Sequence, residues 1–310
     1  MEDVLVSVIC NTYNHEAYIR QCMEGFLAQK TSFRFEILVH DDASTDHTAD
    51  IIREYEAKYP ELIYPIYQIE NQYSKGNPIS PTIQFPRARG KYLAFCEGDD
   101  YWTDPFKLQK QVSFLETHSD YSSSVHNVLT IDKNCNPLYK NSFGDEDCDY
   151  YIDGTLHFPQ TSSFVMKNPL LDQSEVGKEI ASQIFDADSS YILYMQKTGK
   201  TRLFSDYMSH YRLVIDSGDS HSARKKRTNM TEFWIGNELN LCRQINAYHM
   251  NLDISPHVFK NMCIYPFMFF VRHPNLENWR LYIKSRKKFP FSEKVFIREL
   301  IKRILEKALS

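Results

Sequence analysis

Glycine is scarce in this chain, with 10 residues in 310, and long apolar runs are missing. The longest, Cys263 to Val271, has nine residues and contains Pro266, whereas a helix needs about 20 apolar residues to span a bilayer. No Gly-rich phosphate loop follows the first strand-like run, which argues against a dinucleotide oxidoreductase and a sugar-nucleotide nucleotidyltransferase. The seven cysteines form no CxxC pair, and Met1 leads directly into a strand-like run. We therefore expect a reducing, cytoplasmic compartment.

Charge is distributed unevenly along the chain. Residues 1–220 carry 19 basic and 33 acidic side chains, whereas residues 221–310 carry 17 and 7. This asymmetry predicts two parts with different partners, a domain over 1–220 and a basic, mainly helical region over 221–310. Because the motif-rich part is acidic, we do not expect a nucleic-acid partner. A hydrophobic content of 42% is typical of a globular protein.

Strand and helix patterns alternate through the first 115 residues, which predicts an α/β fold with a parallel sheet. The expected strands are Val4 to Cys10, Phe35 to His40, Leu62 to Tyr67 and Tyr92 to Cys96, and the expected helices are Ala17 to Gln29, Thr45 to Tyr59 and Phe106 to Thr117. Further strands are predicted at Ser123 to Ile131 and Leu203 to Leu213, and a helix at Ser189 to Gln196. The stretch from Asn134 to Pro159 reads as an irregular excursion.

Polar side chains follow three of the predicted strands, in Asn11 to Asn14, Asp41 to Asp46 and Glu97 to Tyr101. Ligands of open α/β sheets bind beyond the carboxyl ends of the strands, so these groups are expected to share one crevice. Clustered carboxylates repel one another unless a cation is bound. Oxygen-rich ligation suits Mg²⁺ or Mn²⁺ held together with substrate phosphates. The simpler interpretation is that Ser44 or Asp46 caps the following helix.

Three segments carry a family resemblance. They are Val6 to Asn14 (VSVICNTYN), Glu36 to Asp46 (EILVHDDASTD) and Gly90 to Trp102 (GKYLAFCEGDDYW). In this order they resemble the family 2 glycosyltransferases of the GT-A fold, over roughly residues 4–215. The run Glu97 to Gln111 is similar to the bacterial members that assemble surface polysaccharides. The resemblance implies a Rossmann-like, mixed, mostly parallel sheet with flanking helices, followed here by a C-terminal helical extension.

The same resemblance assigns roles to the donor-binding residues. Tyr13 would stack on the nucleobase, Asp42 would bind its edge, and Asn11 would line the same pocket. The family's DxD motif reads Glu97-Gly98-Asp99 here, so Glu97 would contact the donor. A basic residue before this strand often meets the diphosphate, which points to Arg89.

The resemblance implies a cation site as well. Asp99 and the following Asp100 would hold Mn²⁺ or Mg²⁺ and, through it, the diphosphate. Glu97 stands where the family has its first Asp. Many relatives carry a His where this chain has Val214, so a contact from that position is not expected.

Family spacing also suggests an acceptor side. Asp188 is the candidate catalytic base, with Asp186 as the alternative, because Gly199-Lys200 and Tyr211-Arg212 follow at the family's intervals. An Asp at the start of a helix is equally typical of an N-cap. Three small polar residues in a predicted acceptor-side strand complete the set: Thr161, Ser162 and Ser163.

Together these features predict an inverting glycosyltransferase that moves a sugar from a nucleotide-diphosphate donor, by family preference a UDP-sugar, to a hydroxyl of a growing, lipid-linked cell-surface glycan. Apolar residues at helical spacing between Ser292 and Leu309, with basic residues off that face, predict an amphipathic helix. It would either rest on the anionic inner face of the cell membrane, giving a peripheral location, or pack on the catalytic domain. The alternative function is a non-catalytic nucleotide-sugar-binding or scaffolding subunit of a polysaccharide assembly complex.

Overall fold

The computed structural model describes residues 3–151, 159–171 and 188–214, together with eight isolated positions from Phe267 to Ile283. The chain divides into two compact units, of which the first is Met1–Tyr151 with Phe158–Val214. The predicted C-terminal helical extension lies almost entirely outside the described residues, although seven of the eight isolated positions are helical. No helix among the described residues is long and apolar enough to span a membrane.

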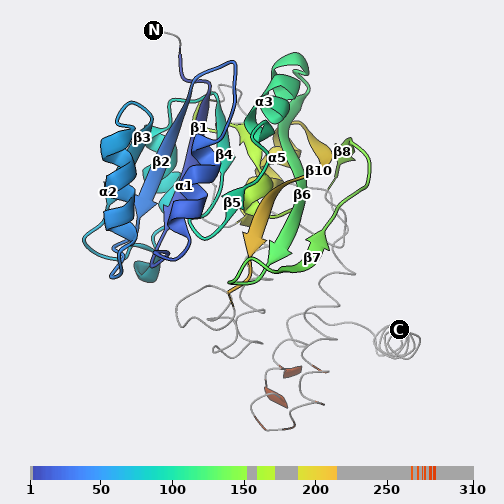
Figure 1. The fold of residues 1–310 in the computed structure, drawn as a ribbon. Coiled ribbons are helices and arrows are strands. Elements are labelled where there is room, and N and C mark those ends of the chain that lie inside the picture. Colours follow the sequence, from blue (N-terminus) through green and yellow to red (C-terminus); the bar gives the residue numbers. More distant parts are fainter. Residues whose placement is uncertain are drawn as a thin grey trace. The chain divides into compact units, whose positions relative to one another are not determined.

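The first unit is built on a mixed sheet of ten described strands (Figure 1). They are β1 (Val6–Thr12), β2 (Phe35–Asp41), β3 (Ile63–Tyr67), β4 (Tyr92–Phe95), β5 (Tyr101–Trp102), β6 (Tyr121–Ile131), β7 (Pro137–Asn141), β8 (Cys148–Tyr150), β9 (Val165–Lys167) and β10 (Lys200–Arg212). The order is β3-β2-β1-β4-β9-β6-β10-β5, with β7 added to β6 and β8 to β10. Four longer helices among the described residues accompany them: α1 (Ile19–Leu27), α2 (Thr48–Lys58), α3 (Lys107–Thr117) and α5 (Asp188–Thr198).

Six strands run in the same direction. Strands β3, β2, β1 and β4 pair in parallel, β9 is antiparallel to both β4 and β6, and β10 is parallel to β6. The carboxyl ends of β1, β2, β4, β6 and β10 therefore share one edge of the sheet. The predicted mostly parallel α/β sheet is confirmed.

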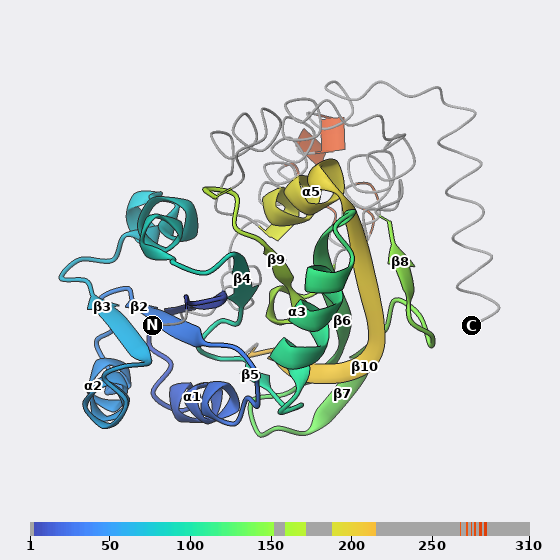
Figure 2. The same ribbon diagram turned by 90° about the horizontal axis from the view of Figure 1, so that it is seen from above.

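Helices cover both faces of the sheet. Alternate residues of β1 (Val6, Val8 and Cys10) are buried against α1 and α2 as a strand with period 2 requires. The opposite face buries Phe95, whose ring stacks on Tyr191 of α5 with centroids 5.2 Å apart. Figure 2 shows α1 and α2 beside β2 and β3, and α5 on the other side of the sheet, near β9, β6 and β10.

Two parts of the sequence-based assignment are wrong. The stretch 134–159, predicted to be irregular, contains β7 and β8. Four of the five β7 residues are exposed, because this edge strand has no buried face to generate an alternating pattern. Residues Thr161–Ser163, predicted as a strand, form a short 3₁₀ turn (η4) before β9.

Candidate functional site

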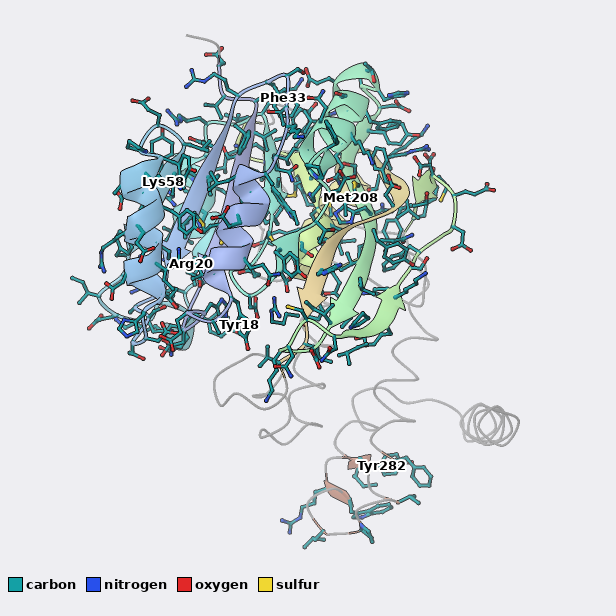
Figure 3. All side chains as sticks on the ribbon, viewed as in Figure 1. Tyr18, Arg20, Phe33, Lys58, Met208 and Tyr282 are labelled. Atoms are coloured by element: carbon teal, nitrogen blue, oxygen red, sulfur yellow. The ribbon has the colours of Figure 1, made fainter. Side chains whose placement is uncertain are left out.

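The polar segments predicted to converge do lie at one edge of the sheet, because β1, β2 and β4 are parallel neighbours. This is the edge where β10 also ends. Figure 3 shows Tyr18, just before α1, at this edge, whereas Phe33, just before β2, lies at the opposite one.

The loops after β1 and β2 are tied together by reciprocal hydrogen bonds. The backbone N–H of Asn14 donates to Ser44 Oγ (2.9 Å), and the backbone N–H of Thr45 donates to Asn14 Oδ1 (2.8 Å). The Glu16 N–H donates to Asp46 Oδ2 at 3.0 Å. Asn14 has a left-handed φ of 54°, a conformation that Asn tolerates better than most residues. These bonds fix the two loops relative to each other.

Asp46 also contacts the next helix, although the N-cap residue of α2 is His47, which makes no side-chain capping bond. Its Oδ1 accepts the N–H of Thr48, the first residue of α2, at 2.9 Å. Burial would raise the pKa of Asp46, but the hydrogen bonds from Thr48 and Glu16 outweigh it and lower the pKa. Asp46 is therefore a structural carboxylate of this edge.

Asn11 points toward the segment after β3. Its Nδ2 donates to Ser80 Oγ at 2.9 Å, and its Oδ1 accepts a hydrogen bond from Gln84 Nε2 at 3.2 Å. Gln84 also donates to the carbonyls of Cys10 and Leu38, both at 3.1 Å. Asn11 is thus oriented by a side-chain network that includes the backbone of β1 and β2.

Asp42 is 2% exposed and holds a loop that follows β3. Its Oδ1 accepts the N–H of Gln72 at 2.7 Å, and its Oδ2 accepts the N–H of Tyr73 at 3.0 Å. Asn71 Nδ2 donates to the Asp42 carbonyl at 3.1 Å. The loop is closed by Gly76, which has a φ of 79°. Asp42 and half-buried Tyr13 lie on neighbouring loops at this edge.

The acidic turn follows β4. The Asp100 N–H donates to the Glu97 carbonyl at 3.0 Å, which closes the turn, and the Gly98 N–H donates to the Asn11 carbonyl at 2.9 Å. A Cβ on Gly98 would lie 2.5 Å from Thr12 Oγ1. Glycine is therefore needed for the turn to approach β1 this closely.

The carboxylates of this turn point in different directions. Asp100 is 3% exposed, and its Oδ1 accepts the N–H of Arg212 at 2.8 Å. The Asp99 side chain is 24% exposed, and its Oδ2 lies 3.8 Å from His15 Nε2. Two buried polar atoms beside Gly98, Thr12 Oγ1 and His15 Nδ1, have no hydrogen-bond partner in the described part of the chain.

The described residues contain no group of three or more His, Cys, Asp or Glu side chains that could hold a metal ion. The acidic turn offers the partly exposed carboxylate of Asp99, with the imidazole of His15 beside it, and Glu97 in the same turn is half-buried as well. This donor set fits a divalent cation that takes most of its ligands from phosphates and water, as Mg²⁺ commonly does.

Arg89 is not brought to this edge. It precedes β4, and its Nε donates to Glu36 Oε2 at 2.6 Å near the start of β2. The guanidinium also lies 4.9 Å from the centroid of the Tyr64 ring. This is the amino-terminal edge of the parallel strands, so Arg89 contributes to the fold and we no longer assign it a diphosphate contact.

The predicted acceptor-side residues are buried, and Ser162 and Ser163 make hydrogen bonds within the protein. Ser162 and Ser163 are fully buried, and Thr161 is 8% exposed. Ser162 Oγ and Ser209 Oγ share a hydrogen bond of 2.9 Å, while the Ser163 carbonyl accepts Gln111 Nε2 at 3.0 Å. These contacts join η4 to β10 and α3, so we withdraw the acceptor contact for Ser162 and Ser163.

Asp188, the candidate base, is the first residue of α5. The position of its side chain is outside the described part of the structure, and so is Asp186 altogether. Val214 is buried, with 4% of its surface exposed, immediately after β10. The roles of Asp188 and Asp186 stay predictions.

Two side chains at this edge were missed by the sequence reasoning. His15 faces Asp99, and Arg212 contacts the acidic turn. Their signals were present, since His15 follows the first polar segment directly and Arg212 belongs to the Tyr-Arg pair. Nothing in the spacing, however, indicated that either would reach Glu97 to Asp100.

Comparisons with known proteins agree with this architecture. The family model for glycosyl transferase family 2 matches residues 7–175. An uncharacterized protein of Mycobacterium tuberculosis is 35% identical over 239 residues, which cover 74% of this chain but 63% of that protein. The chain thus spans less than two thirds of that relative.

Two further matches are a glycosyltransferase related in sequence and a solved structure that shares the fold. The putative teichuronic acid biosynthesis glycosyltransferase TuaG of Bacillus subtilis is 30% identical over 229 residues, covering 70% of this chain and 82% of TuaG. Among solved structures, S. aureus TarS 1–349 in complex with UDP-GlcNAc matches with a TM-score of 0.67 at 18% identity, over 92% of this chain and 80% of that one. The structural match supports the predicted GT-A fold. Because the family model covers more than half of the sequence, the chain belongs to glycosyl transferase family 2.

Proposed function

We propose that this protein transfers a sugar from a nucleotide-diphosphate donor, a UDP-sugar, to a hydroxyl of a cell-surface glycan, with inversion at the anomeric carbon. The observation that carries the proposal is the meeting of three polar segments, led by Asn11, Asp42 and Asp99, at the carboxyl edge of one parallel sheet. This is where α/β folds bind nucleotides. Family membership supports glycosyl transfer as the reaction.

The donor's nucleoside would lie on the β1 and β2 side of the edge. Tyr13 offers an aromatic face for the base, and such stacking contributes about 1 to 3 kcal/mol in nucleic-acid binders. Asn11 is held in one orientation by Ser80 and Gln84, which would reduce the cost of ordering it on binding. UDP is the favoured nucleotide because TarS, which shares the fold, binds UDP-GlcNAc.

The diphosphate would lie beside the acidic turn. Asp99 would hold Mn²⁺ or Mg²⁺ jointly with the diphosphate oxygens, and when bound the cation would stabilise the negative charge that develops on the leaving group. The structure of a mannosyltransferase from Pyrobaculum calidifontis in complex with GDP-Man and Mn²⁺, which matches this chain with a TM-score of 0.50 at 12% identity, supports a divalent cation in this proposal. Glu97, at the start of the turn, would contact the donor.

The proposed chemical step is one in-line displacement. The acceptor hydroxyl oxygen forms a bond to the anomeric carbon as the bond from that carbon to the diphosphate oxygen breaks. The hydroxyl proton passes to the carboxylate of Asp188, and the nucleoside diphosphate leaves with the electron pair of the broken bond. A base of this kind works by position as much as by pKa.

The acceptor is proposed to be lipid-linked. Residues 221–310 carry 17 basic and 7 acidic side chains, and the periodicity of Ser292 to Leu309 is amphipathic. Each basic residue near an anionic leaflet contributes about 1 kcal/mol of attraction. A peripheral position at the inner face of the membrane would bring the enzyme to a glycan that is anchored there.

Calorimetric titration tests the donor site. The full chain is titrated with UDP, GDP, CDP and dTDP, each with and without Mn²⁺. We expect UDP to bind in the presence of Mn²⁺ and far more weakly in its absence. If the folded protein binds none of the four, the proposal fails and a scaffolding role becomes the better account.

Release of UDP tests the transfer step. The substrates are UDP-GlcNAc and UDP-Glc with a polyprenyl-diphosphate-linked sugar as acceptor, with and without anionic vesicles. We expect Asp188→Asn to lower turnover by about 10²- to 10⁴-fold, the usual contribution of a general base, while UDP affinity is retained. Asp206→Asn is the matched control, because Asp206 is an exposed carboxylate that pairs with Lys110. Wild-type turnover by Asp188→Asn would exclude this base.

A further inference from the structure

The acidic turn Glu97 to Asp100 is held from both sides. On one side the Gly98 N–H donates to the Asn11 carbonyl at 2.9 Å, and the backbone of Gly98 lies against Thr12 of β1. On the other side the turn contacts the last residue of β10, Arg212. The turn is therefore clamped between two strands that run in the same direction but are not neighbours in the sheet.

The contact between the turn and β10 is reciprocal. Asp100 Oδ1 accepts the backbone N–H of Arg212 at 2.8 Å, and Arg212 Nε donates to the backbone carbonyl of Asp99 at 2.9 Å. Each residue thus uses its side chain to hold the backbone of the other segment. Both are nearly fully buried, with 3% of Asp100 and 2% of Arg212 exposed.

The guanidinium of Arg212 is fixed by further contacts. Its Nη2 donates to Gln21 Oε1 of α1 at 2.7 Å. Its Cζ lies 4.6 Å from the centroid of the Tyr18 ring and 5.6 Å from that of Tyr101. Its Nη1 lies 3.3 Å from Cys135 Sγ in the turn between β6 and β7. Arginine suits this position because its planar group can stack and donate at the same time.

This arrangement separates two neighbouring carboxylates that sequence reasoning treats alike. The carboxylate of Asp100 is turned inward onto a backbone N–H, whereas that of Asp99 is partly exposed beside His15. Because Asp100 is almost fully buried and its Oδ1 already accepts a backbone N–H, its carboxylate is less accessible to a ligand in solvent than that of Asp99.

We infer that Asp100 and Arg212 are positioning residues that clamp the acidic turn, and that Asp99 is the carboxylate of this pair that meets the donor's cation and diphosphate. This inference rests on the proposed donor site and states which of its residues contact the donor and which hold the turn in position. Asp100 and Arg212 act on the donor through the backbone of residues 97–100.

The first test compares conservative variants by the binding of Mn²⁺ in the presence of UDP, measured from the loss of the free Mn²⁺ signal in electron paramagnetic resonance. Asp99→Asn removes the ligand charge, and we expect the affinity to fall by at least about 100-fold, as for a lost charge-assisted contact. Asp100→Asn keeps an oxygen that can accept the Arg212 N–H, and we expect a loss of less than about tenfold. Asp100→Ala removes the acceptor of the Arg212 N–H, and we expect its loss of Mn²⁺ affinity to lie between those of Asp100→Asn and Asp99→Asn.

The second test removes the guanidinium. We expect Arg212→Ala to raise the Mn²⁺ concentration needed for half-maximal UDP binding by about tenfold or more, as for a lost outer-shell partner of a metal site, and millimolar guanidinium in the buffer to reverse part of this loss. Arg202→Lys is the matched control, because Arg202 lies near the start of the same strand, 3.6 Å from Asp147. A purely stabilising role would lower the melting temperature of Arg212→Ala without changing its Mn²⁺ dependence.

The outcomes are distinguishable. If wild-type protein shows no Mn²⁺-dependent binding of UDP, GDP, CDP or dTDP, the proposed function fails before the variants are compared. If wild type binds and Asp100→Asn loses as much affinity as Asp99→Asn, Asp100 is a ligand and the inference is overturned. If Arg212→Ala fails to fold, the Mn²⁺ affinities of Asp99→Asn and Asp100→Asn still test whether Asp100 is a ligand.

Discussion

Lys107, the first residue of α3, is fully buried. Its Nζ donates to Gln111 Oε1 at 2.8 Å and lies 4.3 Å from the centroid of the Trp102 ring. Burial lowers the pKa of Lys107 to about 7 from an ordinary value of 10.5, although Cys96 and Asp104 oppose the shift. At neutral pH the folded protein therefore holds a lysine that is partly uncharged.

The sign of the effect on stability follows from proton linkage. Between pH 7 and 10.5 the unfolded chain binds a proton on Lys107 that the folded chain does not, so the free energy of unfolding rises with pH across this window. Below pH 7 both states are protonated, and the full penalty of burying the ammonium applies. The lowered pKa corresponds to about 2 kcal/mol of added stability between pH 7 and pH 9.

The perturbation is Lys107→Met, which keeps an unbranched chain of similar length but cannot titrate. The assay is urea unfolding of wild type and variant at pH 7, 8 and 9 and constant ionic strength. We expect the stability of wild type relative to Lys107→Met to rise by about 2 kcal/mol from pH 7 to pH 9. Other titrating groups cancel in this difference.

Lys110→Met is the control on the same helix. Hydrogen bonds to Asp104 and Asp206 raise the pKa of Lys110, so it stays protonated in both states through this range. The difference between wild type and Lys110→Met should not change between pH 7 and pH 9. A pH-independent difference for Lys107→Met as well would refute the reasoning, because it would mean that Lys107 keeps an ordinary pKa when buried.

Two further predictions follow from close contacts in the sheet. Gly98→Ala would place a Cβ 2.5 Å from Thr12 Oγ1, and we expect a loss of about 1 to 3 kcal/mol of stability, typical of overpacking, together with weaker Mn²⁺-dependent UDP binding. Unaltered UDP binding would show that the turn can shift without consequence. Arg89→Ala would remove the partner of Glu36, a buried carboxylate, and we expect a loss of about 1 to 3 kcal/mol in urea unfolding with unchanged affinity for UDP. Weaker UDP binding by Arg89→Ala would contradict this and would indicate that Arg89 contacts the donor.

The parts of the fold that the sequence predicts well are those with a buried face. Strand β1 is a short, almost wholly buried apolar run, helix α1 buries residues at helical spacing, and both lie where these patterns indicate. Strand β7 was missed because four of its five residues are exposed. Strand β5 has only two residues, too few to show a period.

The sequence predicted which loops meet at the site, but not which side chains contact one another there. The positions of Asn11 near the end of β1, and of Asp42 and Asp99 after β2 and β4, follow from the strand assignment alone. The same logic, applied consistently, would have placed Arg89 at the other edge, because it precedes a strand instead of following one. Small polar side chains such as Ser162 satisfy a buried neighbour, here Ser209, as readily as they meet a substrate, and sequence does not distinguish the two.

The acidic turn explains why counting carboxylates overestimates a cation site. Closely spaced carboxylates repel one another, and a bound cation is one way to relieve this. Backbone donors and a buried arginine are another, and this chain uses them: Asp100 is turned onto the Arg212 N–H, and the Arg212 guanidinium donates to the carbonyl of Asp99. At the proposed donor site, a cation would therefore act on the donor's diphosphate and not on the conformation of the turn. We expect removal of divalent cations to weaken nucleotide binding while leaving the protein folded.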